Sequence, residues 1–338
     1  MKHFKTLAAS AVMALACAGV AQAGPTVDAV KQKDFIQCGA NTGLPGFSSA
    51  NAEGVWEGLD VDVCRAVAAA VLGDASKVKF TPLTAQQRFT ALQSGEVDML
   101  SRNTTWTLSR DTKLGLNFAG VNFYDGQGFM VPVKLGVKSA TELSGATICV
   151  EPGTTTELNL ADYFRAKKME FEPVVIENQD EALAAFFAGR CDVYTTDASG
   201  LASARVTKSP NPADYAILPD IISKEPLGPA VRHGDDQWLD IVKWSLLAMI
   251  EAEEKGITSA NVDEMKGSND PGIQRLLGVT PGMGEALGVD EEWAYRIIKQ
   301  VGNYGESYQR NITDVLGLER GVNALWTDGG LMYAFPAR

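Results

Sequence analysis

The chain contains few of the residues that build most metal and hydrolytic centres. It has two histidines and five cysteines among 338 residues, and no two cysteines form a Cys-x-x-Cys pair. Zinc sites usually need such pairs, so we expect neither a metal nor a cofactor. His233 has no serine or cysteine nucleophile in a recognisable motif beside it, which disfavours a hydrolase of the Ser-His or Cys-His kind. A buried pair of catalytic carboxylates stays open at this stage.

Positive charge is also scarce. The chain has 30 lysines and arginines against 42 aspartates and glutamates, a formal net charge of -12. Nucleic acids and anionic membrane surfaces attract basic proteins, so neither is an expected partner. An acidic surface is typical of a soluble protein that stays monomeric, and a monomer is our expectation. Net charge does not identify the ligand, because the charge of a pocket is local.

Long apolar segments are missing after the first 23 residues. The run Leu7–Val20 is short for a membrane span of roughly 20 residues, and it ends near Ala21-Gln22-Ala23, a small-residue cleavage site. We therefore predict that residues 1–23 are a signal peptide, cleaved after Ala23, and that the mature protein is exported. A membrane anchor and a lipid-modified Cys17 are the alternatives.

Four cysteines remain after this cleavage, and an even number in an exported chain suggests disulfides. Three pairings are possible. We favour Cys38–Cys64 and Cys149–Cys191, because each would join a strand to a neighbouring element within one half of the chain. Free buried thiols are the alternative.

The 315 residues after the signal exceed one ordinary core, which favours two domains. Short apolar strands alternate with helices, a pattern that predicts an α/β fold with largely parallel sheets. Asp60 and Asp180 are candidate N-caps, and glycines end the helices. We expect strands at 35–38, 77–81 and 97–100, then again at 147–150, 174–177 and 191–196.

The two halves resemble each other locally. Residues 91–98 (ALQSGEVD) and 185–192 (AFFAGRCD) both read as a helix end, a glycine, two residues and an aspartate before a strand. Two lobes of similar construction explain this pattern, although it is also a common helix-to-strand turn. The extended segments Gly126–Lys134 and Pro226–Arg232 are the expected crossings between lobes, and we expect the C-terminal region to pack on the first lobe.

Arg110 is the central candidate for ligand binding. A guanidinium matches a carboxylate with two parallel hydrogen bonds. Asn103 and Thr105 share its segment, which follows the strand 97–100, and ligands of open parallel sheets bind beyond the carboxyl ends of strands. The alternative is that Arg110 pairs with Asp111 or caps a surface helix.

Two further segments follow strands in the second half. Thr154 and Thr155 open a helix after a glycine, and free backbone N–H groups there attract anions. Asp197 ends the strand 191–196 and could accept from an ammonium group. The alternatives are that the threonine and the aspartate only cap helices. Together with Arg110, these groups predict capture of a free amino acid, which carries both a carboxylate and an ammonium.

Weaker candidates surround this set. Asn41 and Leu44 lie in the loop after the first strand, Arg88 begins a helix from which it could reach a ligand side chain, and Trp106 is a candidate pocket wall. Each such residue is more often found on a surface or in a core.

The sequence resembles the periplasmic amino-acid-binding proteins of ABC transporters, solute-binding protein family 3, and within them the general L-amino-acid binders. The resemblance covers essentially the whole mature chain. It rests on residues 92–98 (LQSGEVD), 105–110 (TWTLSR), 117–118 (NF), 151–157 (EPGTTTE), 191–197 (CDVYTTD) and 226–244 (PLGPAVRHGDDQWLDIVKW).

The resemblance implies a two-lobe α/β fold, the type II periplasmic-binding-protein fold, with two hinge crossings. Lobe 1 would comprise residues 24–128 and 229–338, and lobe 2 residues 129–228. The family implies a periplasmic receptor without enzymatic activity that delivers L-amino acids of broad type to an inner-membrane ABC permease. The alternatives are a narrow glutamate and aspartate binder, a dehydratase-like enzyme on the same scaffold, and a sensor module.

Carried over by motif, the resemblance assigns roles to the candidate residues. Arg110 would hold the α-carboxylate, aided by Thr105 and the backbone near Thr155, and Asp197 would hold the α-ammonium. Asn41 and Leu44 match ligand-lining positions of the first loop. Asn103 departs from the glycine common in relatives, and an acidic residue is common where this chain has Ser109. These departures bear on selectivity.

Overall fold

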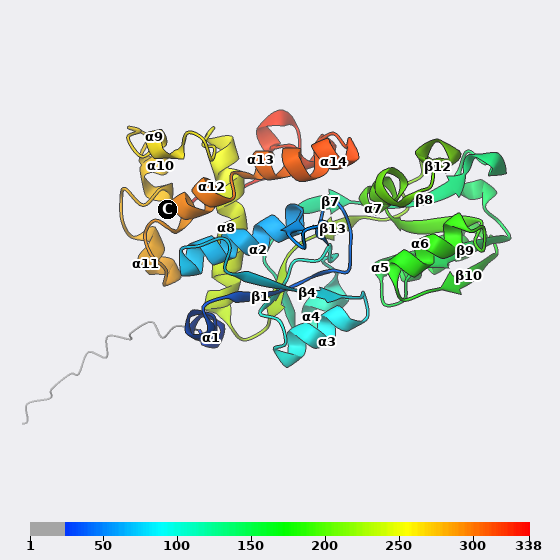
Figure 1. The fold of residues 1–338 in the computed structure, drawn as a ribbon, viewed down its shortest axis with the longest axis horizontal. Helices are drawn as coiled ribbons and strands as arrows, with labels where there is room; N and C mark the ends of the chain where they lie inside the picture. The colour runs from blue at the N-terminus through cyan, green and yellow to red at the C-terminus, as the bar shows by residue number, and fades with distance from the viewer. Residues whose placement is uncertain (1–23) are drawn as a thin grey trace, which may run out of the picture.

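The computed structural model describes residues 24–338, so the predicted signal peptide and its cleavage site lie outside the described residues. The chain forms two sheet-containing lobes joined by a narrow waist (Figure 1). None of the helices within residues 24–338 is both long and apolar enough to cross a membrane. The mixed α/β architecture is the one that alternating strands and helices predicted.

The first lobe is built on a five-stranded sheet of order β4-β1-β5-β14-β6. The first three are parallel, and β14 runs antiparallel to both of its neighbours. The strands are β1 (Ile36–Asn41), β4 (Val78–Leu83), β5 (Met99–Leu100), β6 (Leu116–Phe118) and β14 (Ala230–Arg232), and the helices are α1 (Pro25–Lys33), α2 (Leu59–Leu72), α3 (Gln87–Ser94) and α4 (Leu108–Thr112). A small hairpin pairs β2 (Ser49–Ala50) with β3 (Trp56–Glu57).

The second lobe repeats this plan, with the sheet order β10-β9-β11-β8-β12. Again the first three strands are parallel and the fourth is antiparallel to its neighbours. The strands are β8 (Gln127–Pro132), β9 (Ala146–Val150), β10 (Phe171–Val175), β11 (Val193–Asp197) and β12 (Tyr215–Ile217), and the helices are α5 (Thr155–Lys167), α6 (Gln179–Phe187) and α7 (Ala198–Ser203). The local sequence echo therefore reflects two lobes of one topology.

The helix ends follow the glycine signals but not the predicted aspartate caps. Gly73 and Gly95 end α2 and α3 in the left-handed conformation, which glycine adopts without strain. Asp60 is wrong as an N-cap, because α2 begins at Leu59 and the buried Asp60 carboxylate accepts from Asn103 and Asn122 instead. Asn178, not Asp180, caps α6.

A two-stranded ribbon forms the waist. It pairs β7 (Phe123–Asp125) antiparallel with β13 (Glu225–Leu227) between the two sheets (Figure 1). The first crossing thus precedes the segment expected for it, since most of residues 126–134 form β8 inside the second sheet. The exact lobe boundaries, 24–128 with 229–338 and 129–228, stay a prediction.

The C-terminal region packs on the first lobe. Its helices, together with α2, enclose the largest buried core of the molecule, which includes Trp238, Tyr304 and Tyr308. The helices are α8 (Asp236–Glu254), α9 (Val262–Met265), α10 (Pro271–Leu276), α11 (Met283–Leu287), α12 (Trp293–Gln300), α13 (Tyr304–Tyr308) and α14 (Asp314–Leu316).

Each lobe contains one disulfide. Cys38 on β1 is bonded to Cys64 on α2, and Cys149 on β9 is bonded to Cys191, which precedes β11. These are the two pairs favoured from the sequence, and they join each parallel sheet to an adjacent element of the same lobe.

Candidate functional site

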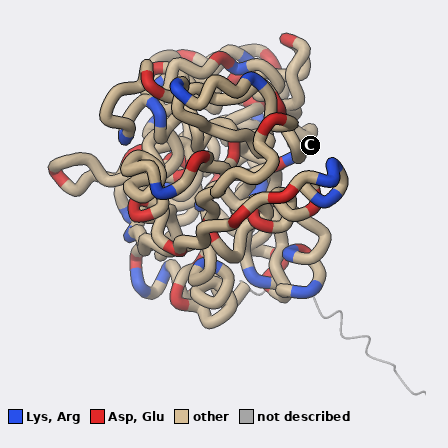
Figure 2. Tube along the Cα trace, turned by 90° about the vertical axis from the view of Figure 1, so that its right-hand side faces the viewer, with Lys and Arg blue, Asp and Glu red and all other residues tan. Residues whose placement is uncertain are grey.

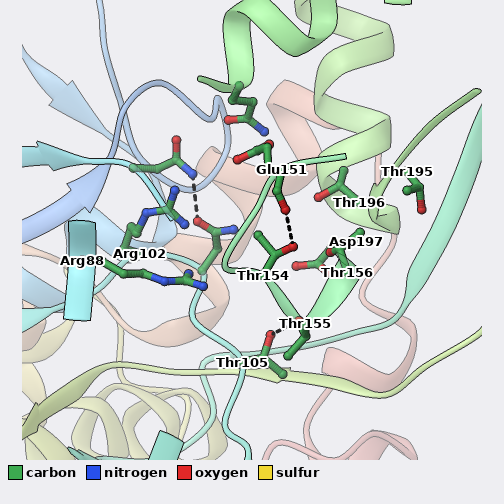
Figure 3. A pocket seen from close by; sticks show the side chains of 13 residues that line it. Arg88, Arg102, Thr105, Glu151, Thr154, Thr155, Thr156, Thr195, Thr196 and Asp197 are labelled. Carbon is green, nitrogen blue, oxygen red and sulfur yellow. Dashed lines mark hydrogen bonds between the residues drawn. The ribbon is translucent and has the colours of Figure 1, made fainter. Parts of the chain in front are cut away.

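A polar pocket lies in the cleft between the lobes, where the carboxyl ends of strands from both sheets face each other (Figure 3). The empty space among its side chains is about 430 Å³ when the open solvent at its mouth is included. It is lined by Asn41, Arg88, Arg102, Asn103, Thr105, Glu151, Thr154, Thr155, Thr156, Gln179, Thr195, Thr196 and Asp197. A pocket at strand ends is the usual ligand position of open α/β sheets.

Three buried arginines lie on the first lobe's side of the site: Arg88 and Arg102 line the pocket, and Arg110 bonds to the backbone of the lining residue Thr105. Arg88, Arg102 and Arg110 are 3%, 3% and 6% exposed. Among the ion pairs within residues 24–338, none involves these three guanidinium groups. Buried charges are normally paired, so these guanidinium groups are candidates for binding an anionic group of a ligand.

Their hydrogen bonds hold the arginines in place without satisfying them. Arg110 Nη1 donates to the backbone oxygen of Thr105 at 2.9 Å, and Arg102 Nε donates to that of Leu83 at 3.0 Å. Arg88 makes only a long contact, 3.4 Å, to the Thr104 hydroxyl, and its Nε has no partner in residues 24–338. The remaining N–H groups are free to bind a ligand.

Burial and mutual repulsion act on these groups. Burial, and then the neighbouring charges of Arg102 and Arg110, hold the pKa of Arg88 well below its ordinary value. Burial lowers the pKa of Arg102 and brings that of Arg110 to about 10. Arg110 is therefore charged at neutral pH. An incoming carboxylate would favour the charged form of all three guanidinium groups.

The second lobe contributes buried carboxylates. Asp197 is 8% exposed and occupies the N-cap position of α7, but its side chain makes no capping hydrogen bond there. Burial, reinforced by the charges of Asp125 and Glu225, raises the pKa of Asp197 well above its ordinary value. Burial also raises the pKa of Glu151, whose carboxylate accepts from the Tyr194 hydroxyl. A ligand cation beside Asp197 would favour its ionised form.

Threonine hydroxyls connect the two sides. Thr154 caps α5 by accepting from the Glu157 backbone N–H at 3.1 Å. Thr155, in the first turn of α5, lies 3.3 Å from the Thr105 hydroxyl of the other lobe and donates to Glu225 at 2.9 Å. Figure 3 shows Thr105 and Thr155 meeting across the cleft. The start of α5 therefore contains a capping residue, Thr154, and both Thr154 and Thr155 line the pocket.

Asn41 and Asn103 form a pair at the first lobe's side of the pocket. Asn41 Nδ2 donates to Asn103 Oδ1 at 3.0 Å, and the Asn103 backbone N–H donates to Asp60 at 2.6 Å. Asn103 has a φ of 36°, within the left-handed region where glycine and asparagine are the usual residues. Asparagine can therefore occupy this backbone position, which most other residues adopt only with strain.

The other sequence candidates lie outside the pocket lining. Arg110 contacts the lining residue Thr105 through its backbone oxygen, and no ion pair within residues 24–338 joins Arg110 to Asp111. Leu44 is buried in the first lobe's core, and Trp106 stacks on Phe118 with ring centroids 5.4 Å apart. Ligand contact by any candidate stays a prediction.

Sequence reasoning missed several lining residues. Arg102 comes two residues after β5, and Glu151 directly follows β9, so their strand-end positions were a usable signal. Gln179 starts α6, and its buried Oε1 has no partner among the described residues. Thr156, Thr195 and Thr196 complete the set.

Comparison with known proteins shows which family the sequence matches. The model of the bacterial extracellular solute-binding proteins, family 3, matches residues 36–257. The chain is 59% identical over its full length, and that of the relative, to the general L-amino acid-binding periplasmic protein AapJ of Rhizobium johnstonii. It is 58% identical, over 97% of this chain and 98% of the relative, to the glutamate/glutamine/aspartate/asparagine-binding protein BztA of Rhodobacter capsulatus.

A solved structure extends the likeness to three dimensions. The periplasmic binding protein of an ABC transporter from Brucella ovis, described with glutathione bound, is 60% identical and superposes with a TM-score of 0.90. The match covers 93% of this chain and 99% of that one. With a family model that matches well over half of its residues, this chain belongs to family 3 of the bacterial extracellular solute-binding proteins.

Proposed function

We propose that this protein is the periplasmic receptor of an ABC importer and binds free L-amino acids of broad side-chain type. The observation that carries the proposal is the charge arrangement of the cleft. Arg88 and Arg102, which enter no ion pair within residues 24–338, face it from the first lobe, and the carboxylates of Asp197 and Glu151 face it from the second (Figure 3). A zwitterion complements both sides at once, and the names of the AapJ and BztA relatives support the same ligand class.

In the proposed binding mode, the α-carboxylate bonds to Arg110 beside Thr105, and the α-ammonium bonds to Asp197. Because these groups belong to different lobes, the ligand joins the lobes. Other contacts already cross the cleft: Thr84 Oγ1 donates to Glu177 at 2.8 Å, and Ser203 Oγ donates to the Pro45 backbone oxygen at 2.9 Å. A ligand that contacts both lobes favours the closed state through its differential affinity.

Delivery follows from closure. We propose that the closed receptor docks on the permease as a monomer and performs no chemistry on its ligand. Acidic and basic positions are interspersed over the second lobe's end of the molecule (Figure 2), without one broad region of a single sign. The docking face is therefore expected to depend on the shape of the paired lobes more than on net charge.

A second candidate ligand class is favoured by the number of arginines. One guanidinium suffices for an α-carboxylate, yet Arg88 and Arg102 are also buried and unpaired in residues 24–338. A ligand with a second acidic or amide group, such as glutamate, glutamine or glutathione, would use them together with Glu151 and Gln179. The BztA name and the glutathione-bound Brucella protein support this class.

The test is calorimetric titration of the mature protein after it has been unfolded and refolded to remove carried-over ligand. The panel contains many L-amino acids, D-glutamate, glutathione and prephenate. One-to-one binding of many L-amino acids, with D-glutamate weak, is the expected result. Binding confined to glutamate, aspartate and glutathione would move the proposal to the second class. Sustained heat of turnover with prephenate would contradict a receptor without enzymatic activity.

A further inference from the structure

The residues after the family match form an extension, 258–338, that contacts the hinge as well as the first lobe's core. Three successive residues that precede the second lobe, 122–124, each contact the extension. Tyr304 Oη donates to the Asn122 backbone oxygen at 2.8 Å, and the Tyr308 ring stacks on that of Phe123 with centroids 6.0 Å apart. In Figure 1, α13 and α14 lie beside β7.

The third contact completes the hydrogen bonding of β7. Tyr124 pairs with Pro226 across the ribbon, and its own N–H and C=O are bonded on the side away from β13. Both go to the side-chain amide of Asn323: Tyr124 N–H donates to Oδ1 at 2.7 Å, and Nδ2 donates to Tyr124 O at 3.0 Å. The amide thus takes the place of a peptide group in a third strand.

The Asn323 amide is held firmly. It ends the 3₁₀ turn Gly321–Asn323 and is 4% exposed. Arg320 Nε donates to the Asn323 backbone oxygen at 2.9 Å, and the two Nη groups of Arg320 donate to Glu253 on α8 at 2.9 and 3.3 Å. Such a bidentate pair fixes geometry well, so the extension presents a rigid edge to β7.

The other strand of the ribbon is held by the first lobe in the same register. Pro226 O accepts from the Trp106 N–H at 2.8 Å, and Leu227 forms a bridge with Thr105. The pair Tyr124 and Pro226 is therefore fixed to the first lobe from both edges.

The next pair along the ribbon belongs to the second lobe. Asp125 accepts from the hydroxyl and the backbone N–H of Ser199 at the start of α7. Glu225 accepts from Asn159 at 2.7 Å and from Thr155 at 2.9 Å, both on α5. In both strands of the ribbon, therefore, the pair 124/226 contacts the first lobe and the adjacent pair 125/225 contacts the second lobe.

We propose that the extension 258–338 is a hinge brace: it fixes β7 up to Tyr124 and confines the pivot of lobe closure to the step between the pairs 124/226 and 125/225. Rotation at this step leaves the brace contacts intact, because they all lie on the first-lobe side. Without the brace, the free edge of β7 would let the pivot spread into residues 122–124, and the lobes would sample a wider range of angles.

The test compares Asn323→Ala with the original protein in the mature, refolded chain. Two measurements are made without any ligand, so that they do not depend on the proposed function. One is the inter-lobe distance distribution from single-molecule fluorescence transfer between bioorthogonal labels at the exposed positions 31 and 167. The other is the hydrogen-exchange rate of the Tyr124 amide. Gln309→Ala, an exposed change within the extension that leaves the hinge contacts in place, is the matched control.

The brace predicts a broader distance distribution and about tenfold faster exchange at Tyr124 in Asn323→Ala, and neither change in Gln309→Ala. Tyr304→Phe, which removes only the hydroxyl that contacts Asn122, should broaden the distribution even if Asn323→Ala does not fold. Unchanged distributions in folded Asn323→Ala and Tyr304→Phe would overturn the proposal. So would exchange that accelerates throughout the extension, because that pattern indicates general destabilisation rather than loss of a brace.

Discussion

At the scale of single residues, the account depends on buried charges that lack partners of opposite sign. Arg88, Arg102 and Arg110 are held by backbone and hydroxyl acceptors but enter no ion pair in residues 24–338. Such an arrangement costs stability unless a ligand completes it, and strained charges of this kind cluster at functional sites. The same reasoning applies to Asp197 on the opposite lobe.

Arg110→Ala should lose most of the affinity for L-amino acids. Truncating one partner of a buried charge pair typically costs about 2–5 kcal/mol, so we expect affinity to fall by roughly 30- to 5,000-fold. Calorimetry measures this against Arg165→Ala, an exposed arginine of the second lobe, as control. An Arg110→Ala protein that keeps micromolar affinity would remove this residue from the site.

Affinity should also depend on pH through Asp197. Its raised pKa means that lowering the pH protonates the carboxylate of the free protein, which then no longer attracts an ammonium group. We therefore expect binding to weaken as the pH falls through the raised pKa of Asp197.

In Asp197→Asn, affinity should be low and nearly independent of pH over the same range. Titrations in several buffers separate proton release from the heat of binding. Equal pH profiles for the original protein and Asp197→Asn would exclude Asp197 as the ammonium partner.

At the scale of elements, strand ends position the site and hydrogen bonds across the cleft hold it closed. The strand-end argument predicted from sequence that Thr105, Thr155 and Asp197 would meet, because parallel strands place their carboxyl ends at one edge. It could not predict the positions of Leu44 and Trp106, since the burial of Leu44 in the first lobe's core and the stacking of Trp106 on Phe118 depend on residues outside their own segments. The start of α2 was also beyond local reasoning, because the buried Asp60 holds Asn103 instead of capping the helix.

The second lobe's disulfide should stabilise it measurably. Cys149 and Cys191 close a loop with a sequence separation of 42 residues. Replacing both with serine should lower the free energy of unfolding by about 2–4 kcal/mol. Urea denaturation followed by circular dichroism measures the change, with reduced original protein as a second reference. Equal stability of the oxidised original and the double variant would show that the bond contributes little.

The contact between Thr84 and Glu177 should favour closure without touching the ligand. Thr84 is half-buried and Glu177 is exposed, so loss of this contact in Thr84→Ala should weaken binding only about two- to fivefold. Adding Glu177→Ala should cause little further loss, because the pair acts as a unit. Additive losses in this double-mutant cycle would mean that the two residues do not act together on closure.

At the scale of the whole molecule, two lobes of one topology surround the site, and an extension of the first lobe reaches the waist. The two-lobe α/β plan could be predicted, since hydrophobic alternation and the repeated ALQSGEVD and AFFAGRCD segments are local signals. The proposed role of residues 258–338 as a hinge brace could not be predicted from the sequence, because the pairing of Asn323 with Tyr124 joins positions 199 residues apart. No local pattern in either segment indicates that pairing.

The central claim is that the cleft binds both charged ends of an amino acid. The most direct measurement is a calorimetric titration of the refolded protein with L-glutamine, its N-acetyl derivative and its α-amide. The N-acetyl form lacks the ammonium that Asp197 would bind, and the α-amide lacks the carboxylate that Arg110 would bind. The account predicts one-to-one binding of L-glutamine and a loss of at least about 100-fold for each derivative. Comparable affinity for either derivative would contradict it.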